Sequence, residues 1–165
     1  TGPGEKTAFL VPGRLWRQQL HDFSNQKWKR HAAHHDFQET FTSSGTTGII
    51  NSRHCVTDIS LYKESYQKGF AQFYGNIEDY VILALLPSYL EREGSSLIYM
   101  VKDLIEKTNN PESGFYLHNH EALIEKLIEL DASGQNIILI GVTYALLDLI
   151  EKQKFHLVDL IIHEE

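Results

Sequence analysis

This sequence is poor in the features that cross-link small proteins, direct them to a membrane or suit them to nucleic acids. It contains one cysteine, Cys55, so no disulfide can form within the chain, and a reducing compartment is expected. No apolar run approaches the roughly 18 residues of a membrane span, and no signal-peptide pattern opens the chain. Basic residues are not in excess: 15 Lys and Arg against 22 Asp and Glu give a formal charge of −7, which argues against nucleic-acid binding. We therefore expect a cytoplasmic protein with no membrane span and no nucleic-acid partner.

What is present is the composition of an ordinary globular protein. Hydrophobic residues make up 42% of the 165 residues, enough for one core without a disulfide or a metal. Residues 1–37 show no clear period and contain breakers such as Pro3 and Pro12. We interpret them as an N-terminal arm of uncertain order, a small separate subdomain or a segment added to the natural chain. Residues 38–165 are interpreted as the folded domain.

Strand and helix patterns alternate from residue 58 onward. Apolar residues at helical spacing, with polar caps and glycine or proline stops, predict helices over 58–75, 95–108, 119–134 and 144–152. Apolar runs predict strands over 80–86, 114–118, 136–142 and 157–163. Strands that are apolar throughout are typical of a parallel sheet buried on both faces. The predicted fold class is therefore α/β, a mostly parallel sheet with helices on both faces in a Rossmann-like three-layer arrangement.

Two of these helices have a predicted core face. In the first helix that face is aromatic, and helical spacing favours core packing over a binding site for Tyr62, Tyr66, Phe70 and Phe73. In the third helix the expected core face consists of Leu123, Ile124, Leu127 and Ile128.

Residues 41–48 read F-T-S-S-G-T-T-G, and they are the one stretch that points to chemistry. Glycine and hydroxyl residues cannot pack a core, but a loop of them can present backbone N–H groups and hydroxyls to a triphosphate. The loop follows a strand-like run and is expected to precede a helix, the setting of many phosphate-binding loops. A flexible linker is the alternative. We interpret the loop as nucleotide-binding through Thr42, Ser43, Ser44, Gly45, Thr46, Thr47 and Gly48.

The predicted sheet suggests where the rest of a site would lie. Ligands of parallel sheets bind at the carboxyl ends of the strands. Three loops would then meet at one edge: the Ser/Thr/Gly loop, residues 87–96 and residues 141–144. Within the second of these loops, the candidate substrate-binding residues are Pro87, Ser88 and Tyr89; for Tyr89 the alternative is a half-buried packing residue.

The Ser/Thr/Gly loop resembles the phosphate loop of the adenylate-forming enzymes, which make acyl-AMP from a carboxylate and ATP. The residues S-R-H at 52–54 and L-P-S-Y-L-E-R-E-G-S-S-L at 86–97 are similar to the acyl-protein synthetase family of that superfamily. The resemblance covers residues 38–165. It implies that ATP, with Mg²⁺, activates a fatty or other carboxylate as acyl-AMP, and that the acyl group then passes to a protein thiol. It implies as partner an acyl-CoA reductase or another acyl-acceptor protein.

The resemblance also implies roles for single residues. The superfamily usually places a lysine shortly after the last glycine of the loop, and Arg53 is the candidate catalytic cation in this chain, with a plain surface charge as the alternative. No metal ligands are predicted, although His31, His34 and His35 have helical spacing; Mg²⁺ would arrive with ATP. The family's later glycine-rich segment and its acyl-carrying cysteine have no counterpart here, and Cys55 is interpreted as an inert thiol. The resemblance therefore implies the nucleotide-binding portion of a longer enzyme, inactive alone.

Two other interpretations stay open. One is a non-catalytic nucleotide-binding or regulatory domain that kept the loop and lost the reaction. The other is an interaction domain with a Rossmann-like sheet and no ligand.

Overall fold

The computed structural model describes residues 9–12, 37–42, 53–87, 94–117, 119–152 and 160–164. The chain forms two compact units. We call the first the sheet unit; it comprises Thr1–Gly13, Asn76–Ser88 and Leu104–Glu165. The second, the hairpin unit, comprises Arg14–Gly75 and Tyr89–Asp103.

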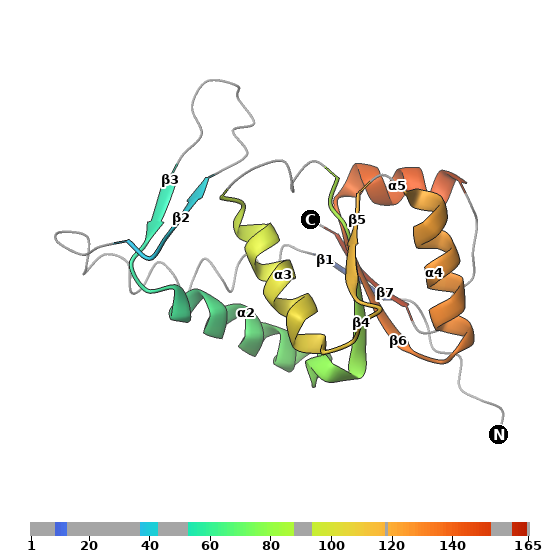
Figure 1. The fold of residues 1–165 in the computed structure, drawn as a ribbon, viewed down its shortest axis with the longest axis horizontal. Helices are drawn as coiled ribbons and strands as arrows, with labels where there is room; N and C mark the ends of the chain where they lie inside the picture. Colours follow the sequence, from blue (N-terminus) through green and yellow to red (C-terminus); the bar gives the residue numbers. More distant parts are fainter. Residues whose placement is uncertain are drawn as a thin grey trace. The chain divides into compact units, whose positions relative to one another are not determined.

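A five-stranded parallel sheet forms the centre of the sheet unit (Figure 1). In spatial order its strands are β1 (Phe9–Pro12), β7 (Leu160–Glu164), β6 (Asn136–Gly141), β4 (Tyr80–Leu85) and β5 (Gly114–Tyr116). Every neighbouring pair runs parallel. The chain passes from β4 outward to β5 and then returns across β4 to β6, so the strand order reverses between β4 and β6. The predicted α/β class with a parallel sheet is confirmed.

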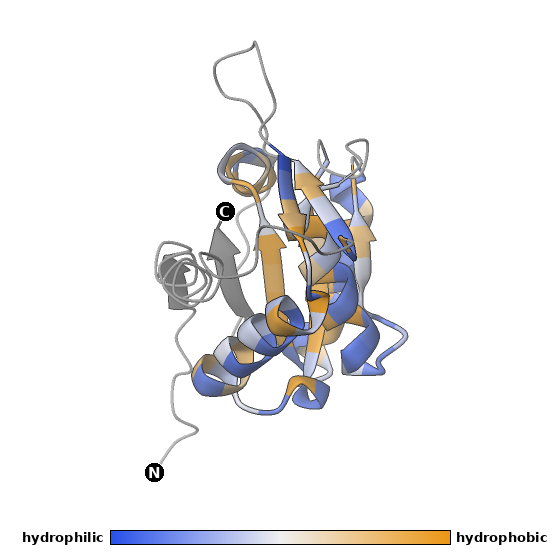
Figure 2. Ribbon diagram, turned by 90° about the vertical axis from the view of Figure 1, so that its left-hand side faces the viewer, coloured by the Kyte–Doolittle hydropathy of each residue, from blue (hydrophilic) through white to orange (hydrophobic). Residues whose placement is uncertain are grey.

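The two central strands explain why the apolar runs do not alternate with polar residues. In β4 every residue from Val81 to Leu85 is buried, and in β6 every residue from Ile137 to Gly141 is buried. Figure 2 shows the central strands mostly in the hydrophobic colour, whereas the helices have one hydrophobic and one hydrophilic side. A strand covered on both faces needs apolar side chains in both directions. Each fully buried aliphatic side chain contributes about 1.5–3 kcal/mol, so these strands form the stable centre of the unit.

Helices connect the strands of the sheet. They are α3 (Ser96–Thr108) between β4 and β5, α4 (His120–Ala132) between β5 and β6, and α5 (Thr143–Lys152) between β6 and β7. A single 3₁₀ turn, η1 (Ile77–Asp79), precedes β4. Asn119 caps α4, because its side chain accepts a hydrogen bond from the N–H of Ala122 at 3.0 Å. Among the helices of the described residues, none is both long enough and apolar enough to cross a membrane.

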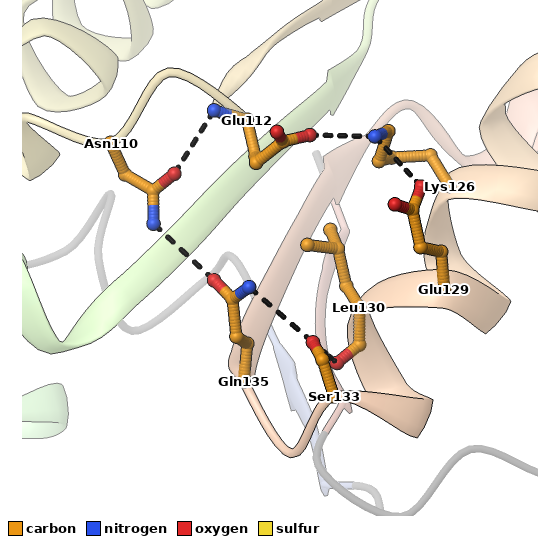
Figure 3. A network of polar contacts seen from close by, with 7 residues as sticks. All are labelled: Asn110, Glu112, Lys126, Glu129, Leu130, Ser133 and Gln135. Atoms are coloured by element: carbon orange, nitrogen blue, oxygen red, sulfur yellow. Dashed lines mark hydrogen bonds and ion pairs between the residues drawn. The ribbon is translucent and has the colours of Figure 1, made fainter.

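A polar network ties the loops before β5 and β6 to α4 (Figure 3). The Nζ atom of Lys126 lies 2.6 Å from Glu112 Oε2 and 2.9 Å from Glu129 Oε2. Hydrogen bonds to Glu112 first, and then to Glu129, raise the pKa of Lys126. The side chains of Asn110 and Gln135 meet at 3.4 Å. Since these loops precede their strands, the network lies at the amino ends of β5 and β6, the end of the sheet that holds no predicted site residue.

The hairpin unit contains the predicted nucleotide loop. Its elements are the antiparallel strands β2 (Glu39–Thr42) and β3 (Arg53–Val56), the helix α2 (Ile59–Tyr74) and the first turns of α3. Asp58 caps α2, accepting a hydrogen bond from the N–H of Ser60 at 3.0 Å. Gly75 ends the helix with φ +84°, a conformation that L side chains rarely adopt.

Two expected core residues are exposed. Ile128 is 44% exposed, because each residue of an α-helix is turned about 100° from the one before, and Leu127 already occupies the centre of the buried face. Phe73 is 41% exposed in the last turn of α2, whereas Tyr66 and Phe70 are buried as expected. The prediction therefore placed one residue too many on the buried face of α4, and it extended the buried face of α2 one turn too far.

Two parts of the strand arrangement also differ from expectation. Phe9–Pro12, within the expected N-terminal arm, forms an edge strand of the parallel sheet, paired with β7. The strand before the Ser/Thr/Gly loop belongs to a separate two-stranded sheet, and β3 follows the loop where a helix was expected. Local sequence did not reveal the first pairing because the partner of β1 lies far along the chain. It did not reveal the second because the residues of β3, R-H-C-V, do not mark a strand. The proposed domain division at residues 37 and 38 stays a prediction.

Candidate functional site

The β2–β3 hairpin forms the stem of the predicted nucleotide loop. Thr42 is the last residue of β2 and Arg53 the first of β3, and they lie directly opposite each other in the antiparallel register. The chain leaves the stem at Thr42 and returns at Arg53. The predicted loop residues Ser43, Ser44, Gly45, Thr46, Thr47 and Gly48 lie outside the described residues. The structure thus brings two predicted site residues together at the base of the loop.

Aromatic packing fixes this stem. Phe41 is buried in β2, and its ring centroid lies 5.3 Å from that of Tyr62 in α2 and 5.6 Å from that of Tyr99 in α3. Such tilted pairs add about 0.5–1.5 kcal/mol to simple burial. The Tyr62 hydroxyl also donates a hydrogen bond to the Ser96 carbonyl at 3.0 Å. The base of the loop is therefore anchored on two helices of the hairpin unit.

The edge of β2 makes a second fixed contact. The backbone N–H of Thr42 donates to the carbonyl of Gly94 at 2.8 Å. That N–H group is therefore occupied, and Thr42 can offer an anion only its side chain. Gly94 was part of the motif that suggested the family, but nothing in the sequence placed it beside Thr42. The sequence signal that could have pointed to this contact is a glycine just before the serine that caps a helix.

Arg53 is exposed at the start of β3, so its guanidinium reaches solvent at the point where the loop returns. His54 is exposed beside it, and Cys55 is a half-buried free thiol opposite Thr40. An exposed cation at the base of a loop can reach an anion held there at little desolvation cost. The position suits both the predicted role of Arg53 and the alternative, a plain surface charge.

Polar side chains of α2 and α3 contact one another in a group that the sequence analysis did not predict. Asp103 accepts a hydrogen bond from Gln67 Nε2 at 3.0 Å and lies 3.6 Å from Lys63 Nζ. The interaction with Tyr99 first, and that with Asp103 second, raises the pKa of Lys63. Burial first, and the Asp103 carboxylate second, raises the pKa of Tyr66. These contacts join the two helices that carry the stem.

The predicted substrate residues belong to the other unit. Pro87 is buried in a turn just after β4, in the sheet unit, and Ser88 and Tyr89 lie outside the described residues. Leu85 and Gly141 are register partners at the carboxyl ends of β4 and β6. The loops that start at residues 87 and 141 therefore do begin side by side, as expected. The Ser/Thr/Gly loop does not start from this sheet.

The described side chains do not form a metal site. In the part of the chain that the structure describes, no three His, Cys, Asp or Glu side chains are grouped so that they could hold an ion. His31, His34, His35 and His118 lie outside that part.

Comparisons with protein-family models, with curated proteins and with solved structures found no match. The likeness to acyl-protein synthetases therefore rests on the motif residues themselves.

Proposed function

We propose that this chain binds ATP through the loop of residues 42–48 and is the nucleotide-binding portion of an enzyme like the acyl-protein synthetases. The observation that carries the proposal is the stem: a loop of glycine and hydroxyl residues starts at Thr42 and returns at an exposed Arg53 in direct register. Hairpin loops rich in glycine can turn several backbone N–H groups toward one anion. The fixed stem would hold the two ends of such a loop in place, and preorganisation of this kind lowers the cost of binding.

The reaction proposed is the two-step activation of a carboxylate. A carboxylate oxygen of a fatty or other acid attacks the α-phosphorus of ATP, the bond to pyrophosphate breaks, and pyrophosphate leaves with the electron pair. A protein thiolate then attacks the acyl carbon and AMP leaves. The loop donors and Arg53 would stabilise the charge that grows on the phosphate oxygens. Mg²⁺ would come with ATP and neutralise part of that charge.

The proposed fold is the three-layer Rossmann-like arrangement. Its support is the handedness of parallel crossovers. The connection from β4 through α3 to β5 and the connection from β5 through α4 to β6 run in opposite directions across the sheet. Right-handed connections in opposite directions put their helices on opposite faces.

The first test measures binding of ATP–Mg²⁺ by titration calorimetry with Arg53→Gln and Lys68→Gln. Both residues are exposed cations of the hairpin unit, and each substitution removes one positive charge; Lys68 lies on α2 and pairs with Glu64. We expect Arg53→Gln to weaken binding about tenfold, the loss of one charge-assisted hydrogen bond. Lys68→Gln should stay within about twofold of wild type. Equal affinities for the two variants would remove Arg53 from the site.

The enzymatic step needs its own assay, because a non-catalytic nucleotide-binding domain would pass the first test. Exchange of labelled pyrophosphate into ATP that depends on an added carboxylate is expected of an enzyme that contains this chain together with the acyl-transfer parts. Exchange that is absent with fatty and short-chain acids alike would leave nucleotide binding as the whole function.

A second candidate site is the reversal point of the parallel sheet. The observation that favours it is the register of Leu85 with Gly141, since ligands of α/β sheets bind where the strand order reverses. It competes with the hairpin loop as the place where a nucleotide would bind.

A further inference from the structure

The helix α5 is apolar on two sides, and only one of them is buried in the core. The buried side consists of Ala145, Leu146 and Leu149. A second set of apolar side chains, which we call the apolar strip, is about half exposed: Tyr144 at 49%, Leu147 at 55% and Ile150 at 48%. Residues three apart on a helix are neighbours on its surface, so the strip is continuous. A helix that is apolar on more than one side is normally covered on each of them.

The neighbouring helix α4 shows what an ordinary exposed helix side looks like in the same unit. Its exposed side chains include the glutamates Glu121, Glu125 and Glu129, and one large apolar residue, Ile128. A single exposed apolar residue is common on protein surfaces and needs no explanation. Adjoining exposed apolar residues, as in the strip of α5, are typical of a surface that binds a partner.

Charge indicates what kind of partner this surface fits. Among the α5 side chains that the structure describes, the charged ones are Asp148 and Glu151, both exposed. They follow Tyr144 and Leu147 by four residues, so they adjoin the strip. The surroundings are acidic as well, since residues 104–152 contain eight Asp and Glu against three Lys and no Arg.

This charge argues against several occupants and favours one. A second copy of the chain docked through the same strip would place Asp148 and Glu151 against their own counterparts, and like charges at an interface oppose binding. An anionic lipid surface is repelled in the same way. A partner that carries lysine or arginine beside its apolar residues is attracted instead.

We propose that the apolar strip of α5 binds an amphipathic helix of another protein, with lysine or arginine at the borders of its apolar face. A helix with apolar residues at positions i, i+3 or i+4, and i+7 has the spacing that packs along such a strip. Its basic residues would pair with Asp148 and Glu151, as charged residues do at the borders of coiled coils. The inference goes beyond the proposed function, because none of the predicted nucleotide-site or substrate residues lies in α5.

The test measures binding of a fluorescently labelled peptide of leucine and lysine by anisotropy. The peptide is about four helical turns long and has its leucines at the spacing given above. Leu147→Ser is compared with Ile128→Ser, since both replace an exposed aliphatic residue on a helix of the sheet unit. We expect Leu147→Ser to raise the dissociation constant about tenfold, as the loss of a central apolar contact does. Ile128→Ser should stay within about twofold of wild type.

A second comparison tests the charge. The same peptide with every lysine replaced by glutamate should bind the wild type at least about tenfold more weakly. In the double variant Asp148→Asn with Glu151→Gln, affinity for the lysine peptide should fall, and added salt should weaken the remaining binding less than it does in wild type.

The other outcomes overturn the proposal. No saturable binding of the lysine peptide, equal affinity for the lysine and glutamate peptides, or equal weakening by Leu147→Ser and Ile128→Ser would each contradict a basic helix on the strip. Sedimentation that shows a dimer abolished by Leu147→Ser would assign the strip to a second copy. Binding to phosphatidylcholine vesicles that is lost in Leu147→Ser would assign it to a lipid surface.

Discussion

At the scale of single residues, the hairpin unit contains a buried hydroxyl with an unusual environment. Tyr66 is fully buried, and its hydroxyl has no hydrogen-bond partner among the described residues. Its ring packs against that of Tyr62 at 5.2 Å. Burial and the nearby carboxylate of Asp103 both favour the neutral phenol, so the pKa of Tyr66 is raised far above its ordinary value.

This environment predicts a pH-dependent stability. Below pH 9, Tyr66→Phe should change the free energy of unfolding by less than about 1 kcal/mol, because the lost hydroxyl makes no hydrogen bond. Above the ordinary tyrosine pKa of about 10, the unfolded chain releases the Tyr66 proton while the folded chain keeps it. The wild type should then lose stability relative to the variant by about 1.4 kcal/mol per pH unit.

Urea unfolding of the wild type and of Tyr66→Phe at pH 7, 9, 10 and 11 measures the difference between their free energies of unfolding. The other titrating groups are the same in the two proteins, so their contributions cancel in this difference. A difference that stays constant up to pH 11 would mean that Tyr66 ionises as readily in the folded as in the unfolded chain.

At the scale of elements, a chain of hydroxyls joins α3 to the sheet just before β5 begins. The buried Thr108 lies in the last turn of α3, and its Oγ1 is 2.9 Å from Ser113 Oγ. Ser113 Oγ also accepts a hydrogen bond from the N–H of Ile82 in β4 at 3.0 Å. One side chain thus satisfies a strand N–H where the neighbouring strand has not yet started.

We predict that Ser113→Ala lowers the free energy of unfolding by about 1–3 kcal/mol, because the N–H of Ile82 loses its acceptor in a buried strand. The matched control is Ser133→Ala, an exposed serine of the same unit whose hydroxyl donates to the Leu130 carbonyl. The control should lose no more than about 0.5 kcal/mol. Thermal and urea unfolding measure the free energy of unfolding of both variants. Equal losses of stability would show that water replaces the Ser113 hydroxyl as the acceptor for the N–H of Ile82.

The elements that sequence predicted well are those specified by local chemistry. The predicted helix over 119–134 is observed as His120–Ala132, and the predicted strand over 136–142 as Asn136–Gly141. A capping asparagine and an unbroken apolar run are visible within a few residues. By contrast, β3 reads R-H-C-V, with nothing in its own residues to mark it as the partner of β2. Its pairing depends on Phe41 packing against Tyr62 and Tyr99, which sequence alone does not bring together.

The candidate site shows the same limit. The hydroxyl and glycine residues of the loop could be recognised from the sequence because they are consecutive. The register of Thr42 with Arg53 could not, since R-H-C-V does not mark a strand, and neither could the contact of Thr42 with Gly94, since it joins segments far apart along the chain. The assumption that all three loops follow strands of the parallel sheet was wrong for the Ser/Thr/Gly loop, because the strand before it, β2, pairs with β3 in a separate sheet.

At the scale of the whole molecule, the chain carries a formal charge of −7 and is proposed to bind a polyanion. Net charge then opposes binding, so affinity must come from local donors and cations. Two places offer themselves: the hairpin loop between Thr42 and Arg53, and the carboxyl ends of β4 and β6 around residues 87 and 141–143. The first has the donor-rich sequence, and the second has the topology usual for α/β proteins.

The most direct measurement is a map of backbone amide chemical shifts by NMR while ATP–Mg²⁺ is added to the isotopically labelled chain. The account predicts saturable shifts at residues 43–48 and at Arg53, with the amides of Gly141, Val142 and Thr143 unmoved. Shifts centred on residues 141–143 would move the nucleotide to the parallel sheet, and no saturable shift anywhere would contradict nucleotide binding altogether.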